Sequence, residues 1–210
     1  MISRLILICS GSTEATRKAR FAADEPLEPK SLAQAAGMAG HLPRAALVYV
    51  SPALRARQTS IALGLDPAPL EGLRDQGAGD WTGKTLPEVE ALDPSALMAW
   101  ITDPTAAPPG GESLQDVAHR VAAVLADLLT QPGTVLAITH PAVIRVAVSL
   151  VLGAPLQSAA KIDVEPLTLT DLRADGRRWH LRALGVPVET GRANLAPKGG
   201  SLRRDYLSPR

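Results

Sequence analysis

Several residues that could do chemistry stand at or within five residues of the ends of apolar runs that have the composition of buried strands. They are Cys9, Ser10 and Gly11 after residues 5–8, Arg55 after residues 46–50, Asp75 after residues 68–70, and His140 after residues 134–139. A hydroxyl, an imidazole and a carboxylate in one crevice form the set that acyl transfer uses. A guanidinium beside them adds charge-assisted bonds to an anion. The sequence therefore predicts one anion-handling site assembled from distant segments.

These residues share a site only if the strands before them end at the same sheet edge. In a doubly wound sheet the carboxyl ends of parallel strands converge on one crevice. The predicted strands are 2–9, 46–50, 68–70 and 134–139, with a terminal hairpin of 167–172 and 179–184. The predicted helices are 31–41 with a Ser31 cap, one starting at Ser51 and Pro52, 86–100 interrupted at Pro94, 113–131, and one from His140 to Leu152. This alternation predicts an α/β fold, a three-layer sandwich with a mostly parallel central sheet.

Composition narrows the class of protein. The 210 residues carry a net charge of +1, 46% apolar residues, one cysteine and six aromatic residues. Neither bulk charge nor aromatic content favours nucleic-acid binding, and no apolar segment approaches the roughly 18 residues of a membrane span. The apolar run before Cys9 is shorter than the roughly 7–15 residues of a signal peptide. We expect a cytoplasmic protein that binds neither nucleic acid nor membrane.

One domain is expected over residues 1–185, followed by an extended or mobile tail over 186–210, which is rich in Gly, Pro and Arg. No His, Cys or Asp cluster has zinc spacing, so we expect no metal and no cofactor. We expect Trp81 to cap the site or pack beneath it and Trp100 to belong to the core. The sequence leaves open whether the protein is a homo-oligomer.

Five motifs in consistent order resemble those of the histidine phosphatase superfamily, whose fold is phosphoglycerate mutase-like. They are CSGSTEAT at 9–16, SPALRARQT at 51–59, LRDQGAGDWTGKT at 73–85, PPGGESLQDVAHRV at 108–121 and ITHPAVIRV at 138–146. The resemblance covers about residues 2–185. It implies a phosphate-binding arginine at Arg55, an acid at Asp75 where the family usually has Glu, and the second histidine of the family at His140.

The departures from the family pattern fall on its chemistry. The resemblance puts Ser10 where the family has its nucleophilic His, Cys9 where it has a phosphate-clamping Arg, and Thr16 where it has Asn. A serine hydroxyl is a poor nucleophile unless a base takes its proton, and a thiol cannot replace a guanidinium fork. The resemblance therefore implies that the fold is kept and the phosphohistidine mechanism is lost.

Three functions remain open. The favoured one is a non-catalytic or weakly active homologue that binds a small anionic or phosphorylated ligand. Its binding residues would be Cys9, Gly11, Thr16, Arg55 and His140. One alternative is a phosphomonoester hydrolase in which His140 or Asp75 activates water. The other is a Ser/His/Asp hydrolase with Ser10 as nucleophile, His140 as base and Asp75 as the acid.

Overall fold

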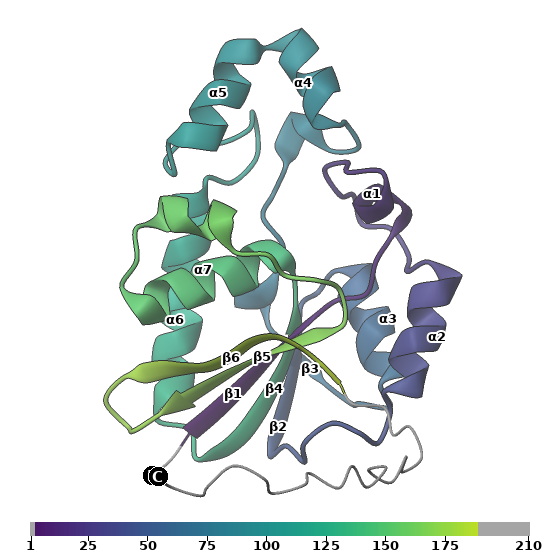
Figure 1. Cartoon of the computed structure of the whole chain (residues 1–210), viewed down its shortest axis with the longest axis vertical. Helices are drawn as coiled ribbons and strands as arrows, with labels where there is room; N and C mark the ends of the chain where they lie inside the picture. Colours follow the sequence, from purple (N-terminus) through teal and green to yellow (C-terminus); the bar gives the residue numbers. More distant parts are fainter. Residues whose placement is uncertain (1–2, 189–210) are drawn as a thin grey trace, which may run out of the picture.

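The computed structural model describes residues 3–188, which form a six-stranded mixed sheet between helices (Figure 1). The strand order is β3-β2-β4-β1-β5-β6. The bounds are β1 (Ser3–Cys9), β2 (Leu47–Val50), β3 (Ala68–Pro69), β4 (Gly133–Thr139), β5 (Thr168–Ala174) and β6 (Trp179–Pro187). The first four strands are parallel, and the hairpin β5–β6 adds to β1 in the antiparallel direction. The predicted fold class is confirmed.

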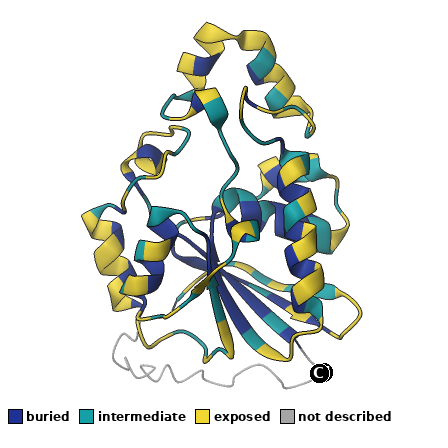
Figure 2. Ribbon diagram, turned by 180° about the vertical axis from the view of Figure 1, so that it is seen from behind, coloured by how far each residue is buried: buried dark blue, intermediate teal, exposed yellow. Residues whose placement is uncertain are grey.

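Two layers of helices cover the sheet because β1 and β4 are apolar on both faces. Leu5, Leu7 and Cys9 face a core shared with α6 (Leu114–Leu129) and α7 (Pro141–Leu152). Ile6 and Ile8 alternate with them and face a second core with α2 (Pro29–Gly37) and α3 (Leu54–Ala62). The central strands β1 and β4 are accordingly mostly buried, whereas the edge strands β3 and β6 are not (Figure 2).

Two further helices project beyond the carboxyl edge of the sheet, at the top of Figure 1. They are α4 (Leu86–Leu92) and α5 (Pro94–Thr102), separated by the predicted break before Pro94. Their base is an aromatic cluster of Phe21, Trp81 and Trp100, with ring centroids 5.4–5.8 Å apart. Trp81 is buried within it. We call α4 and α5 the cap.

Short elements connect these layers. They are α1 (Glu14–Arg17), which follows β1, and the 3₁₀ segments η1 (Glu71–Leu73), η2 (Gly79–Trp81) and η3 (Leu156–Lys161). Helix α6, which lies partly in the family-like motif at 108–121, starts where the sequence predicts, because Ser113 caps it in a capping box with Asp116. No helix among residues 3–188 is long and apolar enough to cross a membrane.

Two predicted helix starts are wrong. Helix α2 begins at Pro29, and Ser31 lies inside it, where its Oγ accepts a hydrogen bond from the Ser12 N–H instead of capping the helix. Helix α3 begins at Leu54 rather than at Ser51. At the other end of the domain, β6 reaches Pro187, and residues 189–210 of the predicted tail lie outside the described residues.

Candidate functional site

The register of the parallel strands lines up the residues that follow them. The Ser10 N–H donates to the carbonyl of Thr139 at 2.8 Å, and the Ser51 N–H donates to the carbonyl of Ile138 at 2.9 Å. The ends of β1, β4 and β2 therefore lie side by side at one sheet edge. Ser10, His140 and Ser51 are the first residues beyond them.

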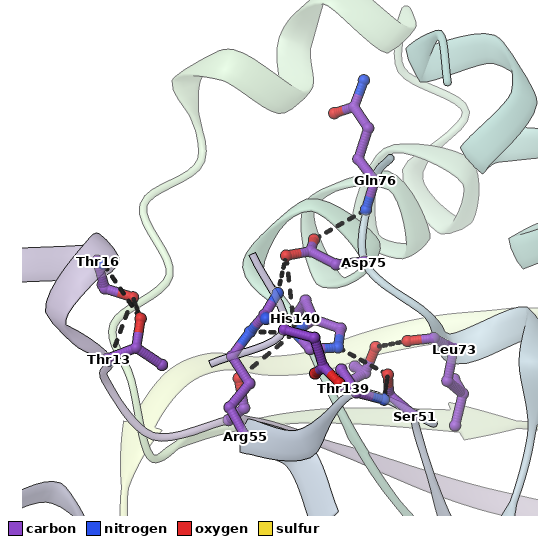
Figure 3. Close-up of polar contacts among 12 residues, drawn as sticks. Thr13, Thr16, Ser51, Arg55, Leu73, Asp75, Gln76, Thr139 and His140 are labelled. Carbon is purple, nitrogen blue, oxygen red and sulfur yellow. Dashed lines mark hydrogen bonds and ion pairs between the residues drawn. The ribbon is translucent and has the colours of Figure 1, made fainter. Parts of the chain in front are cut away.

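His140 is held through both ring nitrogens. Its Nδ1 lies 3.2 Å from Nε of Arg55 and its Nε2 lies 2.7 Å from Oγ of Ser51 (Figure 3). Because the Arg55 Nε always carries a hydrogen, Nδ1 must accept, so Nε2 carries the ring hydrogen and donates to Ser51. His140 is 0% exposed. Burial lowers its pKa to about 4, against the opposing effect of Asp75, and the imidazole is neutral at pH 7.

Arg55 lies in the first turn of α3 and is 6% exposed. Besides its bond to His140, it donates from Nη1 to the Ala23 carbonyl at 3.0 Å and from Nη2 to Oδ2 of Asp75 at 2.5 Å. Ser51, Arg55, Asp75 and His140 thus form a connected set that we call the closed network. Its only cation is already paired with its only carboxylate.

Hydrogen bonds fix the backbone of residues 73–75 as well as the Asp75 carboxylate. Thr139 Oγ1 donates to the Leu73 carbonyl at 2.7 Å, and Arg120 Nη2 donates to the Asp75 carbonyl at 3.1 Å. Burial alone raises the pKa of the Asp75 carboxyl, but His140, Arg55 and the Gln76 N–H together bring it below its usual value. Asp75 is therefore ionised at pH 7 and fixed in place.

Ser10 approaches His140 without a well-formed hydrogen bond. Its Oγ lies 3.5 Å from Nδ1, the same nitrogen that accepts from Arg55, and Oδ2 of Asp75 lies 3.7 Å from that nitrogen. In a Ser-His-Asp triad the acid binds the ring nitrogen opposite the nucleophile. Here the opposite nitrogen faces Ser51, so the three predicted residues meet but not in triad order.

The remaining predicted site residues come from the loop after β1. Burial raises the pKa of the Cys9 thiol to about 12, which leaves it protonated and unreactive. The Gly11 N–H donates to Thr59 Oγ1 at 3.0 Å, and the Thr16 hydroxyl lies 3.2 Å from that of Thr13 in the capping box of α1. None of them supplies a charge.

A cleft of about 270 Å³ opens above the closed network. Six of the seven predicted site residues line it: Cys9, Ser10, Gly11, Thr16, Arg55 and Asp75. His140 does not line it, because it lies beneath this layer. The structure thus brings all seven residues together and places the predicted base on the inner side of the wall.

Sequence reasoning missed several lining residues, chiefly Arg20, Gln76 and Arg145. It also assigned Ser51 to a helix start, although its hydroxyl accepts from His140. The wall of the cleft includes Trp100, whereas Trp81 is buried behind it. The sequence does carry a signal for Arg145: it is the only charged residue in the sequence of α7, PAVIRVAVSLVL. Within residues 3–188 no group of three or more His, Cys, Asp or Glu side chains is arranged to hold a metal.

The chain is similar in sequence to several curated mycobacterial proteins. It is 33% identical over 174 residues to a glucosyl-3-phosphoglycerate phosphatase of Mycolicibacterium vanbaalenii, covering 75% of this chain and 77% of that protein. It is 30% identical over 187 residues to the bifunctional protein Rv2228c of Mycobacterium tuberculosis, covering 83% of this chain. The chain spans about half the length of that relative, 51%.

Structural comparison agrees. The native structure of mycobacterial glucosyl-3-phosphoglycerate phosphatase superposes with a TM-score of 0.77 at 26% identity, covering 89% of this chain and 100% of that one. The model of the histidine phosphatase superfamily (branch 1) matches residues 5–187, almost the whole described domain. With this match and the six-stranded fold in agreement, the chain belongs to the histidine phosphatase superfamily.

Proposed function

We propose that the protein binds a small phosphorylated or otherwise anionic ligand in the cleft and turns it over slowly or not at all. The observation that carries this proposal is the charge of the wall: Arg20, Arg55 and Arg145 line the cleft against the single carboxylate of Asp75. Guanidinium groups make short, charge-assisted and often bidentate bonds to phosphate and carboxylate. A ligand with one or two negative charges would balance this wall.

The arrangement of the closed network argues against fast phosphoryl transfer. Transfer to the protein needs an activated nucleophile, and Ser10 occupies the position where the family resemblance puts the nucleophilic histidine. The nearest base is His140, whose Nδ1 is 3.5 Å from Ser10 and already accepts from Arg55. A hydroxyl that must compete with a guanidinium for the lone pair of its base gains little activation.

The relatives support phosphate as the anion. One solved relative is the complex structure of mycobacterial glucosyl-3-phosphoglycerate phosphatase with inorganic phosphate, which superposes with a TM-score of 0.75 at 26% identity. The curated relative of Mycolicibacterium vanbaalenii is likewise a phosphatase. The shared fold and the arginines that line the cleft together support binding of a phosphate ester.

A second function, hydrolysis of a phosphomonoester by activated water, is favoured by one observation. The Asp75 side chain is 28% exposed and ionised, and it lines the cleft beside Arg55. A carboxylate in that position could orient a water molecule toward a bound phosphorus. Its pairing with Arg55 weakens it as a base, which is why we rank this function second.

The two functions are separated by hydrolysis of p-nitrophenyl phosphate. We expect no turnover above buffer for the wild type and a rate about 100-fold or more above buffer for Cys9→Arg/Ser10→His, because an imidazole nucleophile and a second guanidinium return. The control is Ser12→His, which adds a histidine outside the strand-end position. Robust wild-type hydrolysis that disappears in Asp75→Asn would overturn the proposal and establish water activation.

A further inference from the structure

Arg145 is a half-buried cation whose polar atoms are incompletely used. Its Nε is buried and has no hydrogen-bond partner among the described residues. Within residues 3–188, no carboxylate lies within 4 Å of its guanidinium. Withdrawing a charged donor from water without a partner costs free energy, so such a group points to a missing partner.

Arg145 stands between two cavities. The cleft above the closed network adjoins a second cavity of about 190 Å³, and Gln76, Trp100, Ala142 and Arg145 line both. The rest of the second cavity is mainly apolar. Its other lining residues are Ile101, Pro104, Leu114, Gln157, Ala159 and Ala160. A molecule that reached Arg145 from the cleft would therefore extend onto an apolar wall.

The charge of Arg145 also reaches the place where the family resemblance expects an arginine, position 9. Cys9 lies in the same core as α7 and lines the same cleft. Burial and Asp75 raise the pKa of the Cys9 thiol, and Arg145 is the stronger of the two arginines that oppose this rise. The positive charge of Arg145, supplied from α7, thus lies close to position 9, where the family resemblance expects an arginine side chain.

We propose that Arg145 is the main anion-binding cation of the cleft and that the ligand carries an apolar organic group on its anion, which the second cavity accepts. The inference rests on the proposed function, since it names the ligand class of the same cleft. Arg55 is a weaker candidate because its charge is already offset by Asp75 at 2.5 Å. Arg145 lines the cleft and has no such partner within residues 3–188, so its positive charge is available to an entering phosphate.

The test uses two ligands that cannot be hydrolysed and differ only in the organic group, methylphosphonate and phenylphosphonate, titrated by calorimetry. We expect wild type to bind phenylphosphonate about tenfold more tightly, because the ring leaves water for the apolar wall. Arg145→Gln should weaken both ligands about tenfold or more, and Arg145→Lys should recover part of the loss. Arg57→Gln, which removes an exposed cation from α3, is the matched control and should change neither.

A second variant isolates the apolar cavity. Ala160 is exposed on η3 and lines only the second cavity of the two, so Ala160→Trp should remove the preference for phenylphosphonate and leave methylphosphonate binding unchanged. Far-ultraviolet circular dichroism confirms that each variant is folded.

The outcomes separate the inference from the proposed function. If Arg55→Gln abolishes binding while Arg145→Gln does not, the inference is overturned and the proposed function stands. If wild type binds neither phosphonate, the proposed function itself is overturned. Equal affinity of wild type for the two phosphonates would overturn the assignment of an apolar group to the ligand.

Discussion

Arg55 and Arg145 reach the same cleft from helices on opposite faces of the sheet, α3 and α7. Arg55 donates to His140, Ala23 and Asp75, so its charge is met within the protein. Arg145 has a buried Nε without a partner in residues 3–188. The contrast teaches that burial alone does not identify a binding residue. A buried cation beside a carboxylate has its charge offset within the protein, whereas one without a carboxylate is available to a ligand.

The largest expected effect comes from removing each arginine in turn. Arg55→Met should lower the free energy of unfolding by about 3 kcal/mol, because it leaves Asp75 without its cation and His140 Nδ1 without its donor. Arg145→Met should change it by less than about 1 kcal/mol, since no pair is broken. Urea unfolding of both variants measures the difference. Equal losses would mean that the two arginines do not differ in the way proposed.

Acid should weaken the closed network through His140. Its pKa is about 4 in the folded protein and near 6.5 in an unfolded chain, so between these values the unfolded chain binds the proton first. The free energy of unfolding therefore falls as the pH drops below 6.5, by about 3 kcal/mol at pH 4, and this contribution levels off at lower pH. Asp75, whose folded pKa is lowered, adds a loss only below its ordinary value of 3.8.

His140→Asn tests this assignment, because it should flatten the stability curve between pH 6.5 and pH 4 in urea unfolding experiments. The matched control is His119→Asn, which changes an exposed histidine on α6. Should the His140 variant keep the full wild-type slope, the acid sensitivity would have to come from other groups.

The smallest effect should follow from removing the Ser51 hydroxyl, the buried partner of His140 Nε2. Ser51→Ala deletes the acceptor of the Nε2 hydrogen, and we expect a loss of about 1–2 kcal/mol in the free energy of unfolding. The comparison is Ser158→Ala in η3, outside the network, which should cost less than about 0.5 kcal/mol. Similar values for the two variants, measured by thermal unfolding, would show that Ser51 does not hold the imidazole.

The sequence predicted the sheet edge well for a physical reason. Buried parallel strands are short apolar runs, and whatever follows them must meet at one edge, so the strand pattern alone was enough to place Ser10, Arg55 and Asp75 together. The predicted strands differ from the observed ones by only a few residues. The two misplaced helix starts have one cause. The hydroxyls of Ser31 and Ser51 have the right chemistry for caps, but both take part in tertiary hydrogen bonds, and the one local bond that Ser51 accepts comes from Ala53, which precedes α3.

Other features of the site depend on three-dimensional packing and could not be predicted. The pattern that placed His140 at the edge does not say that Arg55 and Asp75 cover it. Arg145 lies among apolar residues of α7, and only the position of the second cavity gives it a role. Trp81 packs beneath the cleft, as one of its two expected positions had it, but Trp100 lines the cleft instead of lying wholly in the core, because it packs edge-on against Phe21 from a distant segment.

The aromatic cluster at the base of the cap also makes the molecule optically informative. Two of the protein's three tryptophans, Trp81 and Trp100, belong to this cluster, and their ring centroids are 5.8 Å apart. Trp100 also forms part of the wall of both cavities. The third, Trp179, lies on β6, where its Nε1 donates to the Leu125 carbonyl at 2.9 Å. Indole emission depends on the polarity around the ring, so an occupant of either cavity alters the surroundings of Trp100 and leaves those of Trp179 unchanged. The protein therefore carries an intrinsic fluorescent reporter of its own cleft.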